Sequence, residues 1–151
     1  MNNIVMQPIG IVNNDVNNKK DVSWGEDIST ISLYKEYYGG LKGLEDFSHV
    51  TVIYYLDKAE YCKDKHLQRR PQNREDMPLV GIFSQRVKDR PNTIGMTSVE
   101  IVNVTDDSIT VKGLDAIDGT FVLDIKPYYP VYDRKDATVP DWVNKLMEHY
   151  F

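Results

Sequence analysis

The sequence predicts an all-β protein: a small single-domain β-barrel with a short helix near its C-terminus. Several short apolar segments are separated by turn residues, and no helical pattern alternates with them. At 151 residues, of which 41% are hydrophobic, the chain suits one domain covering residues 1–151 with one core. A barrel is expected because closure removes the exposed edges that a row of antiparallel strands would leave.

The first half of the chain contains three predicted strands. Residues 4–12 and 28–34 are the first two, and the polar residues 13–20 between them form a loop without periodicity. Residues 47–56 give the strongest strand signal, because the alternate positions are largely apolar on both faces. This strand is therefore expected at the centre of the sheet.

The second half contains four more predicted strands, and their spacing predicts a meander in which consecutive strands pair. Asp106 and Asp107 form a tight hairpin turn between two of them. The expected strands are residues 79–84, 97–105, 108–112 and 121–125.

The C-terminal residues alone have a helical pattern. After Pro140, four apolar side chains follow at the spacing i, i+3, i+4 and i+7, namely Val143, Leu146, Met147 and Tyr150. Such a stripe more often packs against its own domain than against a partner, so we expect it to cover part of the barrel.

Charge and composition exclude several classes of protein. The net charge of −5 argues against a generic nucleic-acid binder, since that affinity comes from Lys and Arg on phosphates. No apolar run is long enough to cross a bilayer and no signal-peptide pattern is present, so a cytoplasmic location is expected. Cys62 is the only cysteine and the three histidines are far apart in the sequence, so no metal site is expected.

One segment departs from the acidic average. Between residues 63 and 74 there are five cations and a single acidic residue, a pattern that fits local docking to RNA phosphates or an ordinary solvated loop. The RNA-binding candidates are Lys63, Lys65, Arg69, Arg70 and Arg74.

Three further segments carry candidate chemistry. Ser48 and His49 adjoin, but neighbours in a strand point to opposite faces, so His49 is expected to be a hydrogen-bonded structural residue. The loop 86–92 holds arginines that could bind a carboxylate or phosphate. Alternation along residues 121–126 places Val122, Asp124 and Lys126 on one face, where the charged residues form either a simple ion pair or part of a polar pocket.

Four motifs in a fixed order resemble the TsaA-like (YaeB, TrmO) family over nearly the whole chain. They are residues 7–12 (QPIGIV), 43–50 (GLEDFSHV), 90–96 (RPNTIGM) and 118–128 (DGTFVLDIKPY). The resemblance implies a dimeric β-barrel methyltransferase that uses S-adenosylmethionine, with threonylcarbamoyl-adenosine beside the tRNA anticodon as its substrate. It also implies that the cofactor is held by Asp57, Lys58, Arg86, Met96, Asp115, Ala116, Ile117 and Asp118.

Methyl transfer from a sulfonium mainly requires alignment of the methyl group with the accepting nitrogen, and a base for the proton of that nitrogen. Asp118 or Asp124 is the hypothesised base. Lys126 and Tyr128 would orient it, and Arg90 and Asn92 would hold the substrate. Two other functions stay open: a non-catalytic barrel that binds S-adenosylmethionine or a nucleoside as a sensor or adaptor, and a plain RNA-binding barrel.

Overall fold

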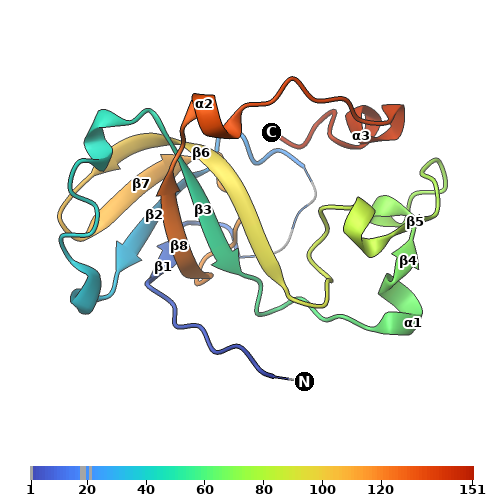
Figure 1. Ribbon diagram of the computed structural model, residues 1–151, viewed down its shortest axis with the longest axis horizontal. Helices are drawn as coiled ribbons and strands as arrows, with labels where there is room; N and C mark the ends of the chain where they lie inside the picture. The colour runs from blue at the N-terminus through green and yellow to red at the C-terminus, as the bar shows by residue number, and fades with distance from the viewer. Residues whose placement is uncertain (1, 18–19, 21) are drawn as a thin grey trace.

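The computed structural model describes residues 2–17, 20 and 22–151 and contains a closed barrel of six antiparallel strands (Figure 1). The order around the barrel is β1-β2-β7-β6-β3-β8, so the predicted all-β barrel is confirmed. The six strands are β1 (Gly10–Asn13), β2 (Ile28–Leu33), β3 (His49–Tyr55), β6 (Ile94–Val104), β7 (Ser108–Lys112) and β8 (Phe121–Pro127).

The barrel is not a meander, and that expectation was wrong. β2 pairs with β7 and β3 pairs with both β6 and β8, so most neighbours are distant in the sequence. Turn spacing marks where strands end but does not specify which strands pair, because pairing depends on burying apolar faces in the closed barrel. The predicted strand 47–56 is present as β3, which is hydrogen-bonded to β6 and to β8; every strand of the closed barrel has two such neighbours, so none of them is central.

One side of each strand faces a continuous core. Val50, Val52 and Tyr54 alternate along β3 and are buried, with 3% or less of each residue exposed. They pack with aliphatic residues from the other strands and with Leu114 and Ala116 from the loop before β8. This loop is therefore attached to the core, and its backbone has little freedom to move.

The first predicted strand is too long. Residues 2–9 have no regular secondary structure, and Ile4 and Val5 are almost fully exposed. Backbone pairing starts at Ile9, whose N–H donates to the Val122 carbonyl at 2.8 Å. An apolar segment needs neighbouring strands on which to pack, and residues 2–8 do not meet them.

Residues 79–84 also differ from the prediction. Only β5 (Val80–Gly81) is extended, and it pairs with β4 (Gln68–Arg69) outside the barrel. These strands, with α1 (Lys63–His66) and the 3-10 turns η3 (Pro71–Asn73) and η4 (Ile82–Ser84), form a small lobe between β3 and β6. Met77 and Ile82 are buried within this lobe. Figure 1 shows it beside the barrel, past the end of β3.

Strand β8 contains a bulge that changes which side chains face the core. Its register with β3 shifts at Leu123, since Ile53 pairs with Asp124 while Tyr54 pairs with Val122. Simple alternation placed Val122 and Asp124 on one face, and that prediction was wrong. The extra residue of a bulge reverses the alternation, so Val122 lies in the core while Asp124 lies outside.

The predicted C-terminal helix is present as α3 (Asp141–Leu146), preceded by the short α2 (Pro130–Asp133). Figure 1 shows α3 above the lobe, with the chain then returning toward the barrel. Among the described residues, no helix is both long and apolar enough to cross a membrane.

Candidate functional site

A cluster of hydrogen bonds surrounds Asp115 at the end of the barrel nearest the lobe. The Tyr54 hydroxyl donates to Asp115 Oδ1 at 2.7 Å, and the Thr97 hydroxyl donates to the same oxygen. The Tyr150 hydroxyl donates to the other carboxylate oxygen, Oδ2. Burial, and next the negative charge of Asp115, raise the pKa of Tyr54 well above its ordinary value. The phenol therefore stays protonated and remains a donor.

Gly95 makes room for the ring of Tyr54. The two residues are direct partners in the pairing of β3 with β6, and a Cβ on Gly95 would lie 2.4 Å from a Tyr54 ring carbon. No other residue type fits this position without moving the ring. The glycine of the RPNTIGM motif is thus explained by close packing beneath Tyr54.

Two of the expected cofactor residues meet beside this cluster. Arg86 Nη2 donates to the Met96 carbonyl at 2.6 Å, which fixes the guanidinium against the start of β6. Burial raises the pKa of both Tyr54 and Tyr150, and it outweighs the opposing effect of the positive charge of Arg86. Arg86, Met96 and Asp115 are therefore brought together by the fold.

The loop 115–118 is fixed by neighbouring side chains. Asn14 Nδ2 donates to the Ala116 carbonyl at 2.8 Å, and the Asn14 backbone N–H donates to Asp118 Oδ1 at 2.9 Å. The Thr120 hydroxyl donates to the Ile117 carbonyl at 2.8 Å. These hydrogen bonds hold the loop 115–118 in place at the barrel mouth.

Asp57 and Lys58 lie in the turn directly after β3, at the same end of the barrel. The N–H of Leu56 donates to the Thr93 carbonyl at 2.8 Å, so this turn lies beside the loop that leads into β6. Both residues are exposed. All the residues that the resemblance assigns to the cofactor therefore lie at one end of the barrel.

The expected catalytic residues are spread over a wider area. Asp124 and Lys126 form an ion pair of 2.9 Å on the outer face of β8, and the carboxylate raises the pKa of Lys126. The backbones of Asp124 and Met96 flank Ile53 on either side, which places them about 10 Å apart across two strand spacings. Asp118 lies at the barrel mouth, before β8 begins.

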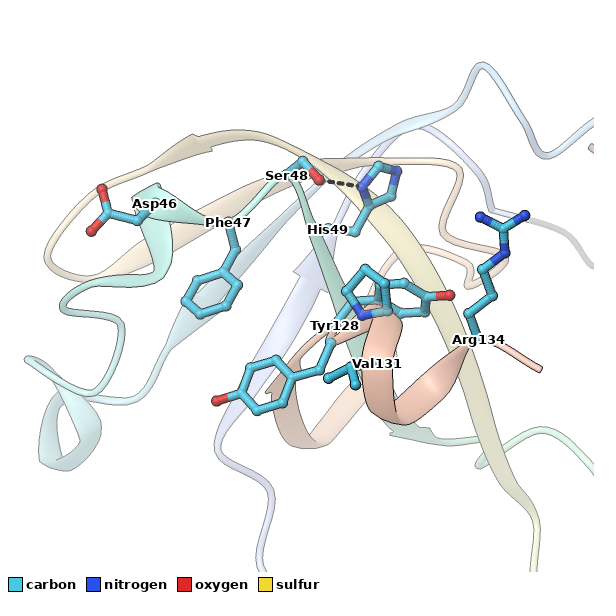
Figure 2. A pocket seen from close by; sticks show the side chains of 9 residues that line it. Asp46, Phe47, Ser48, His49, Tyr128, Val131 and Arg134 are labelled. Atoms are coloured by element: carbon cyan, nitrogen blue, oxygen red, sulfur yellow. Dashed lines mark hydrogen bonds between the residues drawn. The ribbon is translucent and has the colours of Figure 1, made fainter.

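Tyr128 follows β8 at the opposite end of the barrel and lines a separate open pocket of about 830 Å³ (Figure 2). Its ring lies 6.2 Å from the ring of His49, and the rings of Phe47 and Tyr129 stack beside them at 5.9 Å. The fold does not bring Tyr128 together with Asp118, because the length of β8, about 20 Å, separates them.

Ser48 and His49 also line this pocket. Their side chains were expected to point to opposite faces, which was wrong, and His49 was expected to be hydrogen-bonded, which is confirmed. Ser48 Oγ lies 2.7 Å from His49 Nδ1, a hydrogen bond drawn in Figure 2, so the two side chains do not point to opposite faces. Strand alternation does not apply to this pair because β3 begins at His49, and Ser48 belongs to the turn before it. The expected hydrogen-bonded histidine is present.

Arg90 and Asn92 shape the loop before β6. Arg90 Nη1 donates to the Gln85 carbonyl at 2.6 Å, and the Asn92 carbonyl accepts the N–H of Ile94 at 2.8 Å. The guanidinium of Arg90 is thus engaged with the protein backbone, while the expected contact of these two residues with substrate stays a prediction.

Three of the five cations of the basic segment are engaged within the lobe. Arg69 lies 3.7 Å from Asp89, Arg74 pairs with Asp76 at 2.8 Å, and Arg70 donates to the Met77 carbonyl. Lys63 and Lys65 are exposed on α1. RNA binding by this segment stays a prediction.

Sequence reasoning missed four residues that build the site. Tyr54 and Thr97 were included only as strand residues, Asn14 as part of a loop, and Tyr150 as one position of an apolar helical stripe. Only the placement of Tyr54 on the core face of the central strand could have indicated a buried hydroxyl, which needs a hydrogen-bond partner. The other three depend on contacts between distant segments.

The structure defines a small β-barrel with a cluster of hydrogen-bonded polar side chains at one end, and barrels commonly bind small ligands at their mouths. Residues 19–134 match the family model of the tRNA-methyltransferase O N-terminal domain. The chain belongs to this family. Among the described residues, no group of three or more His, Cys, Asp or Glu side chains could hold a metal ion.

Relatives of this chain occur in archaea and in mammals. A probable S-adenosyl-L-methionine-binding protein of Pyrococcus abyssi is 35% identical over 94% of this chain and 77% of its own length. An S-adenosyl-L-methionine-binding protein of Archaeoglobus fulgidus is 35% identical over 86% of this chain and 93% of its own length. A mouse tRNA (adenine(37)-N6)-methyltransferase is 41% identical over 62% of this chain, but only 21% of that enzyme is covered.

A solved structure of TrmO from P. aeruginosa has a similar fold, with a TM-score of 0.76 and 26% identity over 94% of this chain. The chain spans 62% of the length of that TrmO chain.

Proposed function

We propose that this chain binds S-adenosylmethionine and transfers its methyl group to an adenosine in tRNA. The observation that carries this proposal is the meeting of Arg86, Met96 and Asp115 at the barrel mouth, in a chain of the TrmO family. The name of the mouse relative supports methylation at the N6 position of adenine 37. A cytoplasmic location accords with a tRNA substrate.

The specific acceptor that we propose is threonylcarbamoyl-adenosine beside the anticodon, as the motifs in residues 7–12, 43–50, 90–96 and 118–128 imply. In the reaction the methyl–sulfur bond breaks as the bond from the exocyclic nitrogen to the methyl carbon forms. The nitrogen loses a proton to a carboxylate, and S-adenosylhomocysteine leaves. The protein contributes alignment of the reactants and a base, which suits a site where the loop 115–118 is held in place by hydrogen bonds.

Methyl transfer tests the proposal directly. We would incubate the protein with methyl-labelled S-adenosylmethionine and two anticodon stem-loops, one with threonylcarbamoyl-adenosine and one with plain adenosine. Label in the first RNA alone supports the proposed acceptor. Label in the second RNA as well would contradict the requirement for the modification, and label in neither would contradict the transferase.

Asp118 and Asp124 are the two candidate bases. A variant Asp124→Asn that folds normally is expected to lose roughly 10²–10⁴-fold in kcat if this carboxylate accepts the proton, and Asp118→Asn gives the matched comparison. Unchanged turnover in either variant excludes that residue as the base.

A second function is cofactor binding without methyl transfer, because the names of both archaeal relatives state binding only. S-adenosylmethionine binding by a protein that methylates neither stem-loop would favour this function.

We further propose a homodimer that uses the outer face of β3, β6 and β8. Three neighbouring side chains on this face, Tyr55, Ile94 and Met96, are apolar or aromatic and exposed. A second copy docked there would bury them and would cover the Asp124–Lys126 pair. The cofactor residues of one copy could then meet catalytic residues of the other.

The dimer is tested by measuring molar mass in solution by light scattering. Tyr55→Glu is expected to convert a dimer to a monomer, whereas Val5→Glu, in the exposed N-terminal segment, should leave the mass unchanged. A wild-type monomer, or a Tyr55→Glu variant that stays dimeric, contradicts this interface.

A further inference from the structure

The C-terminal segment returns to the barrel and is bound to it by main-chain hydrogen bonds. The Ser23 N–H donates to the His149 carbonyl and the Trp24 N–H to the Tyr150 carbonyl, both at 2.8 Å. A Cβ on Gly25 would lie 2.6 Å from the carbonyl carbon of Phe151, so the glycine allows this close approach. Figure 1 shows the chain running back from α3 toward the barrel, with the C-terminus above the barrel at the top of the view.

The position of the segment delivers the Tyr150 hydroxyl to Asp115. Asp115 Oδ1 already accepts from Tyr54 and Thr97, so the hydroxyl of Tyr150 engages the second carboxylate oxygen. Burial, and next the charge of Asp115, raise the pKa of Tyr150, which keeps its hydroxyl protonated. With donors on both oxygens, the Asp115 side chain is fixed in orientation.

The same segment is also attached to the lobe. Lys145 of α3 forms an ion pair of 2.9 Å with Asp76, which also pairs with Arg74. Arg86 lies at the end of the chain segment that forms this lobe. Residues 141–151 therefore connect the lobe on the Arg86 side to the loop on the Asp115 side.

We propose that Tyr150 is a positioning residue for the cofactor site, acting through Asp115 to hold the loop 115–118 against the Arg86 side. This inference rests on the proposed function, because it assigns the loop to S-adenosylmethionine. The family match ends at residue 134, so the contribution comes from a segment outside the matched domain.

The test is a double-mutant cycle on S-adenosylmethionine binding, measured by calorimetry. Tyr150→Phe keeps the ring and removes only the hydroxyl, and it is expected to weaken binding about tenfold, the scale of a hydrogen bond to a charged group. Asp115→Asn is expected to weaken binding as well. The double variant should bind no more weakly than Asp115→Asn alone, because Tyr150 acts through that carboxylate.

Tyr38→Phe, at an exposed tyrosine, is the matched control and should bind like the wild type. Hydrogen exchange of the amides of residues 115–118, measured without cofactor, should be faster in Tyr150→Phe than in this control. A merely structural role would instead lower the melting temperature and leave the two losses in affinity additive.

Three other results would overturn the positioning role of Tyr150. Equal affinity of Tyr150→Phe and wild type overturns the positioning role while leaving the proposed function intact. Tighter binding by Tyr150→Phe also overturns it, because the tail would then compete with the cofactor. No binding by the wild type rejects the cofactor site itself, and the positioning role with it.

Discussion

The hydroxyl of Tyr54 lies at the centre of the candidate site, between Thr97 and Asp115, and only 3% of the residue is exposed. Its burial serves two purposes. The ring packs against Gly95 in the core, and the hydroxyl holds one carboxylate oxygen of Asp115. The same residue thus connects core packing to the geometry of the loop 115–118.

The stability of the protein should depend on the protonation of Tyr54. Its pKa is raised on folding from 10.0, so its contribution is complete below about pH 10 and is lost as the pH rises further, when the unfolded phenol ionises first. We expect the free energy of unfolding to fall above pH 10 by up to about 1.4 kcal/mol per pH unit from this residue.

Urea denaturation between pH 8 and about 11.5 measures this effect, because that range spans the ordinary pKa of a free tyrosine. The wild type and Tyr38→Phe should lose stability along the same curve, whereas Tyr54→Phe should give a flatter one. Parallel curves for Tyr54→Phe and the wild type would contradict a raised pKa for the buried phenol.

Gly95 provides a second prediction for a single residue. Gly95→Ala should lower the free energy of unfolding by about 1–3 kcal/mol, because its Cβ would overlap the Tyr54 ring. Gly81→Ala is the control, since its nearest heavy atom would be 4.0 Å away. Equal stability of the two variants, measured by urea denaturation, would show that the Tyr54 ring can move aside at little cost.

In strand β8, a bulge determines which side chains face the core and which face outward. Because Leu123 is the extra residue, Ile125 packs against the core and Asp124 pairs with Lys126 on the outside. Ile125 is partly buried against the core, so Ile125→Asp should destabilise the protein by about 1–3 kcal/mol, because a charge without a partner replaces an apolar contact.

The comparison variant is Asp124→Asn, which removes only an exposed ion pair and should change the stability by less than about 1 kcal/mol. Chemical denaturation of both variants measures the two changes in the free energy of unfolding. A larger loss in Asp124→Asn than in Ile125→Asp would mean that β8 follows simple alternation without the bulge.

The barrel strands β2, β3 and β7 could be predicted from the local pattern of apolar and polar residues. The helix α3 could be predicted in the same way. The bulge at Leu123 could not, because it arises from the register of β8 on β3, two segments that are distant in the sequence. For the same reason residues 79–84 look like a barrel strand but form part of the lobe. Of their apolar side chains, Ile82 is buried in the lobe with Met77, whereas Leu79 and Phe83 are exposed.

At the scale of the whole molecule, the candidate site forms where three parts of the chain meet. The barrel provides Tyr54 and the loop 115–118, the segment after the lobe provides Arg86, and the C-terminal segment provides Tyr150. The family resemblance named the loop 115–118 and Arg86 as candidates, but not Tyr54. The third follows only from the fold, because a helical stripe reveals packing but not which hydroxyl reaches which carboxylate.

The most direct test of this account is calorimetric titration of S-adenosylmethionine into the wild type and into Arg86→Ala, with Lys35→Ala as an exposed control. We predict micromolar binding, on the order of −8 kcal/mol, by the wild type and the control. Arg86→Ala should bind at least tenfold more weakly. Absence of binding by the wild type, or equal binding by Arg86→Ala, would contradict a cofactor site at the Arg86 and Asp115 end of the barrel.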